Sequence, residues 1–257
     1  DLTEDLAKIS ASSKTLRLPL SRNAYPELLN GLANLPALEA TARTKNLCQI
    51  DLFFLLVYGL ARADADRDWI FDRCREVQFA PNDRLDLWAR EHYKSTIITF
   101  ALTIQNILNN PGITVGIFSH TRPTSKAFLR QIKREFEGNE TLKDLFPEIL
   151  WADPQSQAPK WSEDDGLVVK RKSNPKESTL EAHGLVDGMP TGRHFELLVY
   201  DDVVTEKSVT SPDMMAKTLD ALSLSYNLGS QGGLRRFVGT RYHFNDAYKA
   251  VMDRGTA

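Results

Sequence analysis

The residues best suited to chemistry begin with Lys94, Ser95 and Thr96, which stand between a predicted strand and a predicted helix. The strand is short and apolar and begins near Leu85. The helix follows from apolar residues that recur at the spacing of one helical face: Ile97, Ile98, Ala101, Ile104 and Leu108. Strand, polar turn, Lys-Ser/Thr and helix is the layout of a P-loop, in which backbone N–H groups and the helix N-terminus hold polyphosphate. The lysine then binds the outer phosphates and the hydroxyl holds Mg²⁺.

The turn itself departs from the usual P-loop. The glycine template would place glycine where this chain has Trp88 and Tyr93. Two interpretations therefore stay open: a nucleotide-binding loop, or a capped helix start with a solvated lysine. Just upstream, Gln78 ends a predicted helix over 68–78, and its amide offers a donor and an acceptor that suit an adenine edge. The alternative for Gln78 is an ordinary surface glutamine.

A pair of carboxylates, Asp201 and Asp202, follows directly after a buried-type strand over 195–200. Burial of an unpaired charge costs on the order of several kcal/mol, and α/β sheets bind ligands beyond the carboxyl ends of their strands. The pair is therefore a candidate ligand site, with a solvated turn as the alternative. A further predicted strand, beginning at residue 236, leads into Gly239-Thr240-Arg241.

In a parallel sheet, these three strand ends would meet at one edge and form a site for phosphoryl transfer to water, where positioning and charge neutralisation do nearly all the work. Lys94 would bind the outer phosphates, and Ser95 and Asp201 would hold Mg²⁺. Asp202 would orient the attacking water and help to deprotonate it, and Thr240 would sense the γ-phosphate through its hydroxyl.

The hydrophobic pattern changes near residue 80. Residues 1–80 predict a helical region, with apolar residues at helical spacing over 2–9, 25–35 and 49–62. From Leu85 on, strands alternate with helices, which predicts an α/β fold with a mostly parallel central sheet.

Residues 161–185 predict antiparallel strands, including a β-hairpin insertion with arms over 167–172 and 178–183. The tip of this hairpin carries four cations, which are Lys170, Arg171, Lys172 and Lys176. A contact with DNA or with another subunit, and a solvated turn, both stay open for the tip.

Composition sets further bounds. The chain has 257 residues, of which 42% are apolar, and a net charge of −2, so a DNA partner would need a local basic patch. Cys48 and Cys74 predict free thiols rather than a metal site. The longest apolar run, over 52–61, is too short for a bilayer and no signal peptide is visible, so we expect a soluble, cytoplasmic protein with no membrane contact. The first residue is not Met, and we expect a fragment of a longer protein.

Five stretches together resemble the N-terminal ATPase domain of a tailed-bacteriophage terminase large subunit, the motor that packages viral DNA into procapsids. They are residues 87–96, 117–122, 191–195, 197–202 and 238–244. The resemblance lies in their order and spacing and spans 85–246. It implies a RecA-like P-loop ATPase fold, with the acid pair ending the Walker B strand. The expected domains are a helical extension over 1–80, packed on an ATPase core over 81–257, without the nuclease domain of the family.

The resemblance also implies roles for single residues. Such P-loops often lack the glycines and keep an arginine four residues before the lysine, here Arg90, which we expect to assist catalysis. The implied nucleotide-binding loop comprises Arg90, Glu91, His92, Tyr93, Lys94, Ser95 and Thr96. Gly239, Thr240 and Arg241 resemble the motif that couples hydrolysis to movement. Arg193 resembles an arginine finger supplied to a neighbour's ATP, a device worth about 10³–10⁵ in rate.

Two residues depart from the family pattern. Asp202 stands where many relatives have a longer Glu, so the water must sit closer or the site must close further. Glu91 stands where many relatives have a small residue, and a carboxylate near phosphate must point away or pair with Arg90 or His92.

The implied activity is Mg²⁺-dependent ATP hydrolysis that powers translocation of double-stranded DNA into the procapsid, in the host-cell cytoplasm. The implied partners are DNA, the small terminase subunit, and further copies in a pentameric ring on the portal, while we expect the isolated domain to be monomeric. Two alternatives stay open: a helicase-like DNA translocase, and a nucleotide-binding assembly module that hydrolyses nothing. No second acidic cluster follows residue 246, so we expect no nuclease activity.

Overall fold

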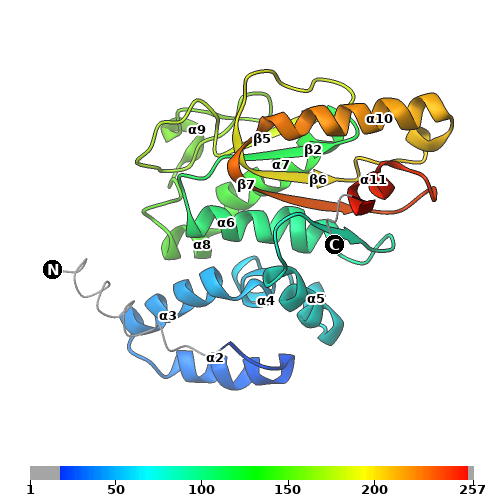
Figure 1. Cartoon of the computed structure of the whole chain (residues 1–257). Helices are drawn as coiled ribbons and strands as arrows, with labels where there is room; N and C mark the ends of the chain where they lie inside the picture. Colours follow the sequence, from blue (N-terminus) through cyan, green and yellow to red (C-terminus); the bar gives the residue numbers. More distant parts are fainter. Residues whose placement is uncertain (1–17, 254–257) are drawn as a thin grey trace.

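A computed structural model describes residues 18–253 of the chain (Figure 1). The helix predicted over 2–9 lies outside the described residues. The elements are, in chain order, η2 (Arg22–Ala24), α2 (Tyr25–Ala33), α3 (Ala37–Ile50), α4 (Leu52–Phe54), η3 (Leu55–Gly59), η4 (Ala63–Ala65), α5 (Asp68–Gln78), β1 (Arg84–Leu87), η5 (Thr96–Leu102), α6 (Thr103–Asn109), β2 (Val115–Ser119), α7 (Arg122–Gly138), α8 (Glu140–Leu145), α9 (Pro154–Gln157), β3 (Trp161–Ser162), β4 (Gly166–Leu167), β5 (Leu180–Gly184), β6 (Phe195–Asp201), η6 (Lys207–Val209), α10 (Pro212–Ser225), η7 (Tyr226–Leu228), β7 (Gly229–Gly239) and α11 (Ala247–Asp253).

The centre of the structure is one seven-stranded sheet in the order β1-β7-β6-β2-β5-β4-β3. The pairs from β1 to β5 are parallel, and β4 and β3 are antiparallel additions at one end. The last strand in the chain, β7, therefore lies between β1 and β6. The predicted α/β fold of the RecA-like type, a mostly parallel sheet flanked by helices, is confirmed.

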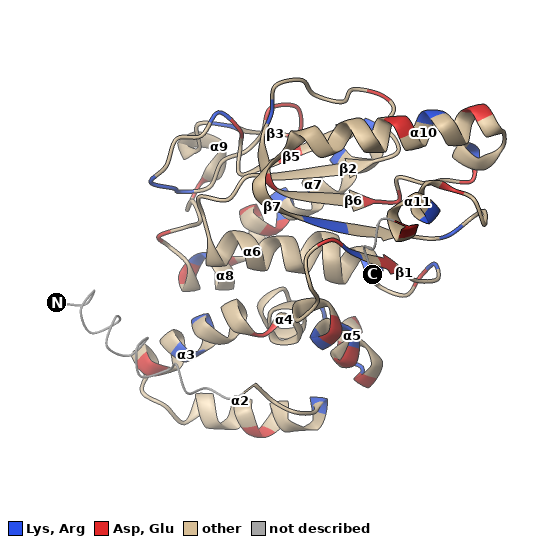
Figure 2. Ribbon diagram, in the orientation of Figure 1, with Lys and Arg blue, Asp and Glu red and all other residues tan. Residues whose placement is uncertain are grey.

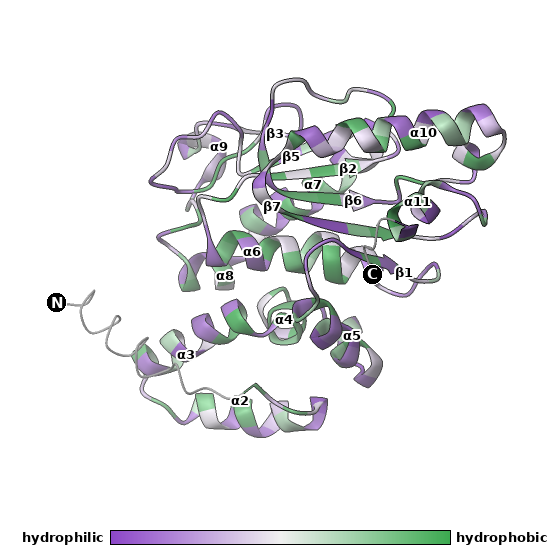
Figure 3. Ribbon diagram, viewed as in Figure 1, coloured by the Kyte–Doolittle hydropathy of each residue, from purple (hydrophilic) through white to green (hydrophobic). Residues whose placement is uncertain are grey.

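Both faces of the sheet are covered. On β6, Leu197 and Val199 join the core cluster of η5, α6 and α7, whereas Leu198 and Tyr200 join the cluster of α10 and α11. Strands buried on both faces are apolar almost throughout, and β2 and β6 are accordingly green in Figure 3. These strands are rigid supports for the polar residues at their ends.

The helices α2 to α5 form a further layer beside η5 and α6 (Figure 1). This layer contains a buried carboxylate, Asp51, which caps α4 by accepting from Phe54 N at 3.0 Å. Tyr25 Oη donates to Asp51 Oδ2 at 2.7 Å, and Arg75 Nη2 lies 2.9 Å from the same oxygen. The layer shares one core cluster with the sheet, while the division into two domains at residue 80 stays a prediction.

The antiparallel region differs from the predicted hairpin. Its second arm is β5, which pairs in parallel with β2, and β4 meets β5 only where Leu167 faces Leu180. The hairpin that forms is β3–β4. The chain between β4 and β5 leaves the ladder because Thr179 Oγ1 accepts from Val169 N at 3.3 Å and because Pro175 has no N–H to donate.

The helix α8 is short and ends at Leu145. Asn139 caps its first turn by accepting from Leu142 N at 2.9 Å, and the chain turns out of the helix before Pro147. Cys48 and Cys74 are buried free thiols, as predicted. Within residues 18–253, no helix has the length and apolar character needed to cross a membrane.

Candidate active site

The predicted P-loop connects β1 to a helix that starts at Lys94 and continues through η5 and α6. Backbone bonds fix the start of the loop to the end of β7. Trp88 N donates to Gly239 O at 3.2 Å, and Thr240 Oγ1 donates to Trp88 O at 3.3 Å. The loop is therefore positioned by the strand that lies between β1 and β6.

Left-handed backbone occurs in the loop without glycine. Tyr93, at the second glycine position of the template, has φ +59°, and Glu91 has φ +64°. Each such residue costs about 1–2 kcal/mol, and strain of this kind clusters at functional sites. Tyr93 thus adopts the conformation that a glycine would supply, and its hydroxyl is held by Asp64 Oδ2 at 2.8 Å.

The three predicted strand ends do meet at one edge of the sheet. Lys94 Nζ lies 3.2 Å from Thr240 Oγ1 and 3.4 Å from Asp202 Oδ1. Ser95 Oγ donates to Asp201 Oδ1 at 3.1 Å. One lysine, one serine, two carboxylates and one threonine therefore share a single site.

Asp201 is fully buried at the end of β6. Burial raises the pKa of Asp201 to about 7; the hydroxyl of Thr99 opposes this shift, the charge of Asp202 adds to it, and Ser95 and Lys94 oppose it. Thr99 donates to the second carboxylate oxygen, Oδ2, and was not among the predicted residues. Its place four residues after Ser95 on one helix was a usable signal, since such residues share a face.

Asp202 is the more open acid, with its side chain 36% exposed. Its φ is +48°, and its N–H donates to Val238 O at 2.9 Å. In the described part of the chain, its buried Oδ1 atom has no hydrogen bond and only the ion pair with Lys94. This left-handed turn directs one carboxylate oxygen at the P-loop lysine.

Four further loop residues are exposed. Arg90 Nη2 donates to Tyr242 Oη at 2.6 Å, and His92 Nδ1 lies 2.8 Å from Arg90 O. Glu91 has no hydrogen bond or ion pair to its side chain among the described residues, so it does not pair with its neighbours. Arg241 donates to Phe244 O at 2.6 Å, which folds it onto its own loop rather than into the site.

Gln78 lies half-buried at the end of α5 and has no free amide group. Its Oε1 accepts from Leu52 N at 2.6 Å, and its Nε2 donates to Ile50 O at 2.5 Å. Both bonds join α5 to the turn between α3 and α4. This geometry argues against the predicted contact between Gln78 and a base.

A pocket of about 600 Å³ lies beside the P-loop. It is lined by Trp69, Arg73, Leu87, Trp88, Ala89 and His92. The Trp69 ring is 38% exposed and lies 6.0 Å from the His92 ring, and the Arg73 guanidinium lies 5.1 Å from the Trp88 ring. Flat rings that are partly open to solvent suit the faces of a planar base.

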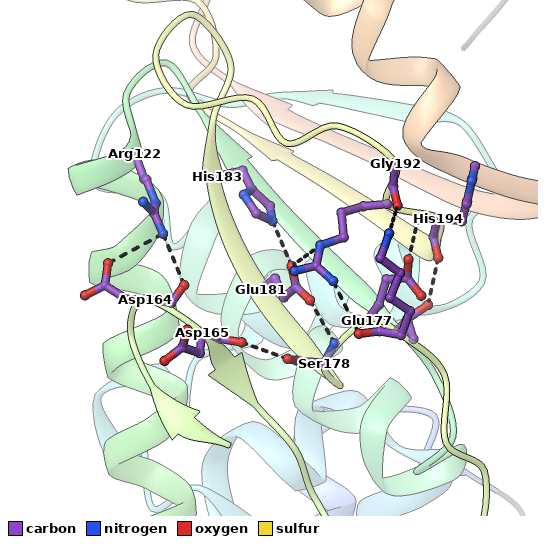
Figure 4. A network of polar contacts seen from close by, with 12 residues as sticks. Arg122, Asp164, Asp165, Glu177, Ser178, Glu181, His183, Gly192 and His194 are labelled. Atoms are coloured by element: carbon purple, nitrogen blue, oxygen red, sulfur yellow. Dashed lines mark hydrogen bonds and ion pairs between the residues drawn. The ribbon is translucent and has the colours of Figure 1, made fainter. Parts of the chain in front are cut away.

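Arg193 lies at the opposite edge of the sheet. Its Nε is 3.4 Å from Glu181 Oε2, and its Nη1 donates to Lys176 O at 3.3 Å (Figure 4). Arg193 precedes β6, whereas Asp201 ends it, and a strand of this length spans about 20 Å. Arg193 therefore does not reach the acid pair of its own chain.

The polar groups at this edge of the sheet suit Mg²⁺. Within the described part of the chain, no three His, Cys, Asp or Glu side chains cluster as a metal cage. Ser95 and Asp201 offer a hydroxyl and a carboxylate oxygen 3.1 Å apart, which are hard oxygen ligands. Mg²⁺ commonly uses one or two such ligands with water and substrate phosphates, so the donor set fits.

The chain was compared with protein families, curated sequences and solved structures, and one structural similarity is relevant to the site. No protein-family profile matches it, and no curated protein sequence matches it. Among solved structures it is similar to the large terminase ATPase domain of Thermus phage P74-26, in an arginine-to-alanine mutant, with 13% identity and a TM-score of 0.42 over 68% of this chain and 67% of that chain.

Proposed function

We propose that this chain is the ATPase domain of a viral DNA-packaging motor, which hydrolyses Mg-ATP to move double-stranded DNA into a procapsid. The observation that carries the proposal is the meeting of the P-loop lysine, the acid pair and Thr240 at one sheet edge. The strained, glycine-free loop supports the proposal too, because strain is kept where it has a use.

In this proposal, each residue of the site has a separate role that follows from its position. Lys94 breaks its contacts with Asp202 and Thr240 and binds the outer phosphates. Ser95 and Asp201 would hold Mg²⁺, which neutralises the phosphate charge when it is bound. Asp202, released from the lysine, accepts a proton from the attacking water. Thr240 then donates to the γ-phosphate and reports its state through β7.

The base of the nucleotide occupies the pocket beside the P-loop in this proposal. Trp69 and Trp88 offer ring faces, and Arg73 offers hydrogen bonds and a planar guanidinium. Gln78 has no part, since both ends of its amide are already bonded.

The position of Arg193, away from the acid pair of its own chain, supports a proposal in which subunits contact one another. We propose a homo-oligomeric ring, a pentamer on the portal, in which Arg193 enters the site of the next subunit. Double-stranded DNA and the small terminase subunit are the other partners, and the host cytoplasm is the compartment. The isolated domain is a monomer in this proposal.

The test is phosphate release from Mg-ATP, measured for the chain, for Asp202→Asn and for Lys94→Ala. The expected result is turnover that Asp202→Asn loses while it keeps ATP affinity. Lys94→Ala loses affinity by about 10–100-fold, since a charge-assisted hydrogen bond contributes about 1.5–3 kcal/mol. Equal ATP affinity in Lys94→Ala and the unmodified chain would contradict the site.

One observation favours a second candidate, a nucleotide-binding assembly module without hydrolysis. The Lys94–Asp202 ion pair joins the two residues that hydrolysis needs separately. This candidate predicts tight ATP binding with no phosphate release, even at protein concentrations at which subunits associate.

A further inference from the structure

A second concave region lies near the start of β5 and is strongly basic. We call it the basic pocket; it measures about 640 Å³, and its cations are Lys160, Lys170, Arg171, Lys172 and Lys176. Its lining contains one acid, Glu177, whose side chain is buried and accepts from His194 N at 2.9 Å. The pocket lining therefore contains five cations and one carboxylate, and this carboxylate already accepts a hydrogen bond from the backbone of His194.

These cations are held without being neutralised. Lys170 Nζ donates to Pro147 O and Lys176 Nζ to Gly192 O, both at 2.8 Å, and Arg171 Nη2 donates to Glu177 O at 2.8 Å. Backbone carbonyls orient a cation but leave its full charge. Within residues 18–253, none of the five cations has an ion pair with a carboxylate.

The basic pocket also contains an unsatisfied donor. Arg171 Nη1 is buried and has no hydrogen-bond partner among the residues that the structure describes. A buried polar group without a partner costs about 1–3 kcal/mol, which an incoming anionic oxygen would remove. The exposed Lys160 and Lys172 side chains have no hydrogen bond or ion pair in the described structure and are free to follow an extended anion.

The location separates this region from the nucleotide. The pocket residues from 168 to 177 directly precede β5, so they lie at the amino ends of the parallel strands. Lys94 and Asp201 lie at the carboxyl ends. The loops around α9 show several blue segments in Figure 2. An anion bound here would not compete with ATP.

We propose that the basic pocket binds the phosphate backbone of double-stranded DNA. The identity of the polyanion rests on the proposed function, whereas the site itself rests on the uncompensated cations. Lysine and arginine contacts to phosphates position a protein on DNA independently of sequence, and each releases counterions. A motor that moves along any sequence needs contacts of this kind.

The experiment measures binding of a short labelled duplex by fluorescence anisotropy as a function of salt. The variant is Lys160→Ala/Lys172→Ala, in which neither side chain has an internal partner to lose. The control is Arg134→Ala/Lys217→Ala, which removes two exposed cations outside the pocket that also have no described partner. Log affinity falls as log salt rises. The steepness of this dependence should decrease by about 2 in the variant, roughly one for each lost phosphate contact, and stay unchanged in the control.

Duplex affinity and salt slope equal to those of the control would overturn the proposal, as would a wild-type chain that binds no duplex at low salt. A changed oligomeric state with unchanged duplex affinity would overturn it in favour of a subunit contact. ATP affinity, measured on the same samples, separates the two proposals. If the wild type binds no ATP while the variant still loses duplex affinity, the proposed function fails and the DNA site stands.

Discussion

At the scale of single residues, the unusual feature is a carboxyl group placed where water cannot reach it. Asp201 is fully buried, and among residues 18–253 only Ser95 and Thr99 donate to its side chain. Its pKa is raised to about 7, from an ordinary value of 3.8, chiefly by burial. The chain therefore holds this carboxyl group in a poorly solvated position.

The pH dependence of stability should reveal this carboxyl group. Between pH 4 and 7, the folded chain holds a proton on Asp201 that the unfolded chain releases, so the free energy of unfolding falls as pH rises. Within this window, the free energy of unfolding falls by at most about 1.4 kcal/mol for each pH unit. Asp201→Asn lacks this titration, and its stability relative to the unmodified chain should rise across the window, measured by urea unfolding with a chelator present.

A parallel pH dependence in the two proteins would contradict the buried, raised carboxyl. Ser95→Ala is the matched control, because it removes one donor to Asp201 and keeps the acid. It should retain the fall in stability with pH.

At the scale of elements, β7 and α11 meet at a position that only glycine fits. A Cβ on Gly239 would lie 2.0 Å from the Tyr248 hydroxyl and 2.4 Å from its ring. Tyr248 is fully buried and donates to Val238 O at 3.3 Å. The glycine of the predicted coupling motif thus has a packing reason as well as any functional one.

Gly239→Ala should destabilise the fold by about 1–3 kcal/mol, the usual cost of overpacking a core. Tyr248→Ala removes the obstructing ring, so the double variant should be more stable than the sum of the single changes predicts. Urea unfolding of all four proteins measures this coupling. Gly31→Ala is the control, because nothing lies within 4 Å of its Cβ, and it should be neutral or slightly stabilising. If the stability changes of the two single variants simply add in the double variant, the Tyr248 ring does not contact position 239.

The helix α5 and the P-loop together make the pocket proposed for the base. Trp69→Ala should weaken ATP binding about tenfold or more, since stacking on an aromatic ring contributes about 1–3 kcal/mol per base. Tripolyphosphate, which has no base, should bind equally well to both proteins in calorimetric titrations. Phe79→Ala removes a 66% exposed ring just beyond α5 and should change neither affinity. Equal losses for ATP and tripolyphosphate would mean that Trp69 supports the loop rather than the base.

The sequence was informative where a local pattern decides the structure. The apolar runs before the loop of Lys94, before Asp201 and before Thr240 predicted three strand ends, and parallel pairing then brought them together. The two bonds of the Gln78 amide could not be predicted, because the groups that it contacts, at residues 50 and 52, are distant in the sequence. The hairpin was misjudged for a similar reason: pairing of β5 with β2 depends on the whole sheet.

At the scale of the whole molecule, the two edges of the sheet carry different residues. The carboxyl edge holds the P-loop and the acid pair, and the amino edge holds Arg193 and the basic pocket. Six residues of β6 separate Asp201 from the loop that carries Arg193. The chain therefore presents the acid pair at one edge of the sheet and an arginine at the other.

This arrangement predicts catalysis between subunits. Arg193→Ala should lower turnover only at concentrations at which subunits associate, because the arginine is about 20 Å from the acids of its own chain. Asp202→Asn should be inactive alone. A mixture should regain activity, since an Asp202→Asn subunit supplies Arg193 to the intact acids of an Arg193→Ala subunit. The measurement is phosphate release per subunit against total protein concentration.

The mixing ratio makes the prediction sharper. As the fraction of one variant in the mixture is varied, activity should pass through a maximum at an intermediate ratio. Each productive site needs one subunit of each kind. An arginine that acts within its own chain gives only the weighted mean of two low rates, at every ratio and concentration. Arg193→Lys is the control for charge alone: a lysine keeps the cation but not the planar pair of donors, so it should restore little of the rate. Full activity of that variant would assign Arg193 to charge balance beside Glu181 rather than to a neighbour's phosphate.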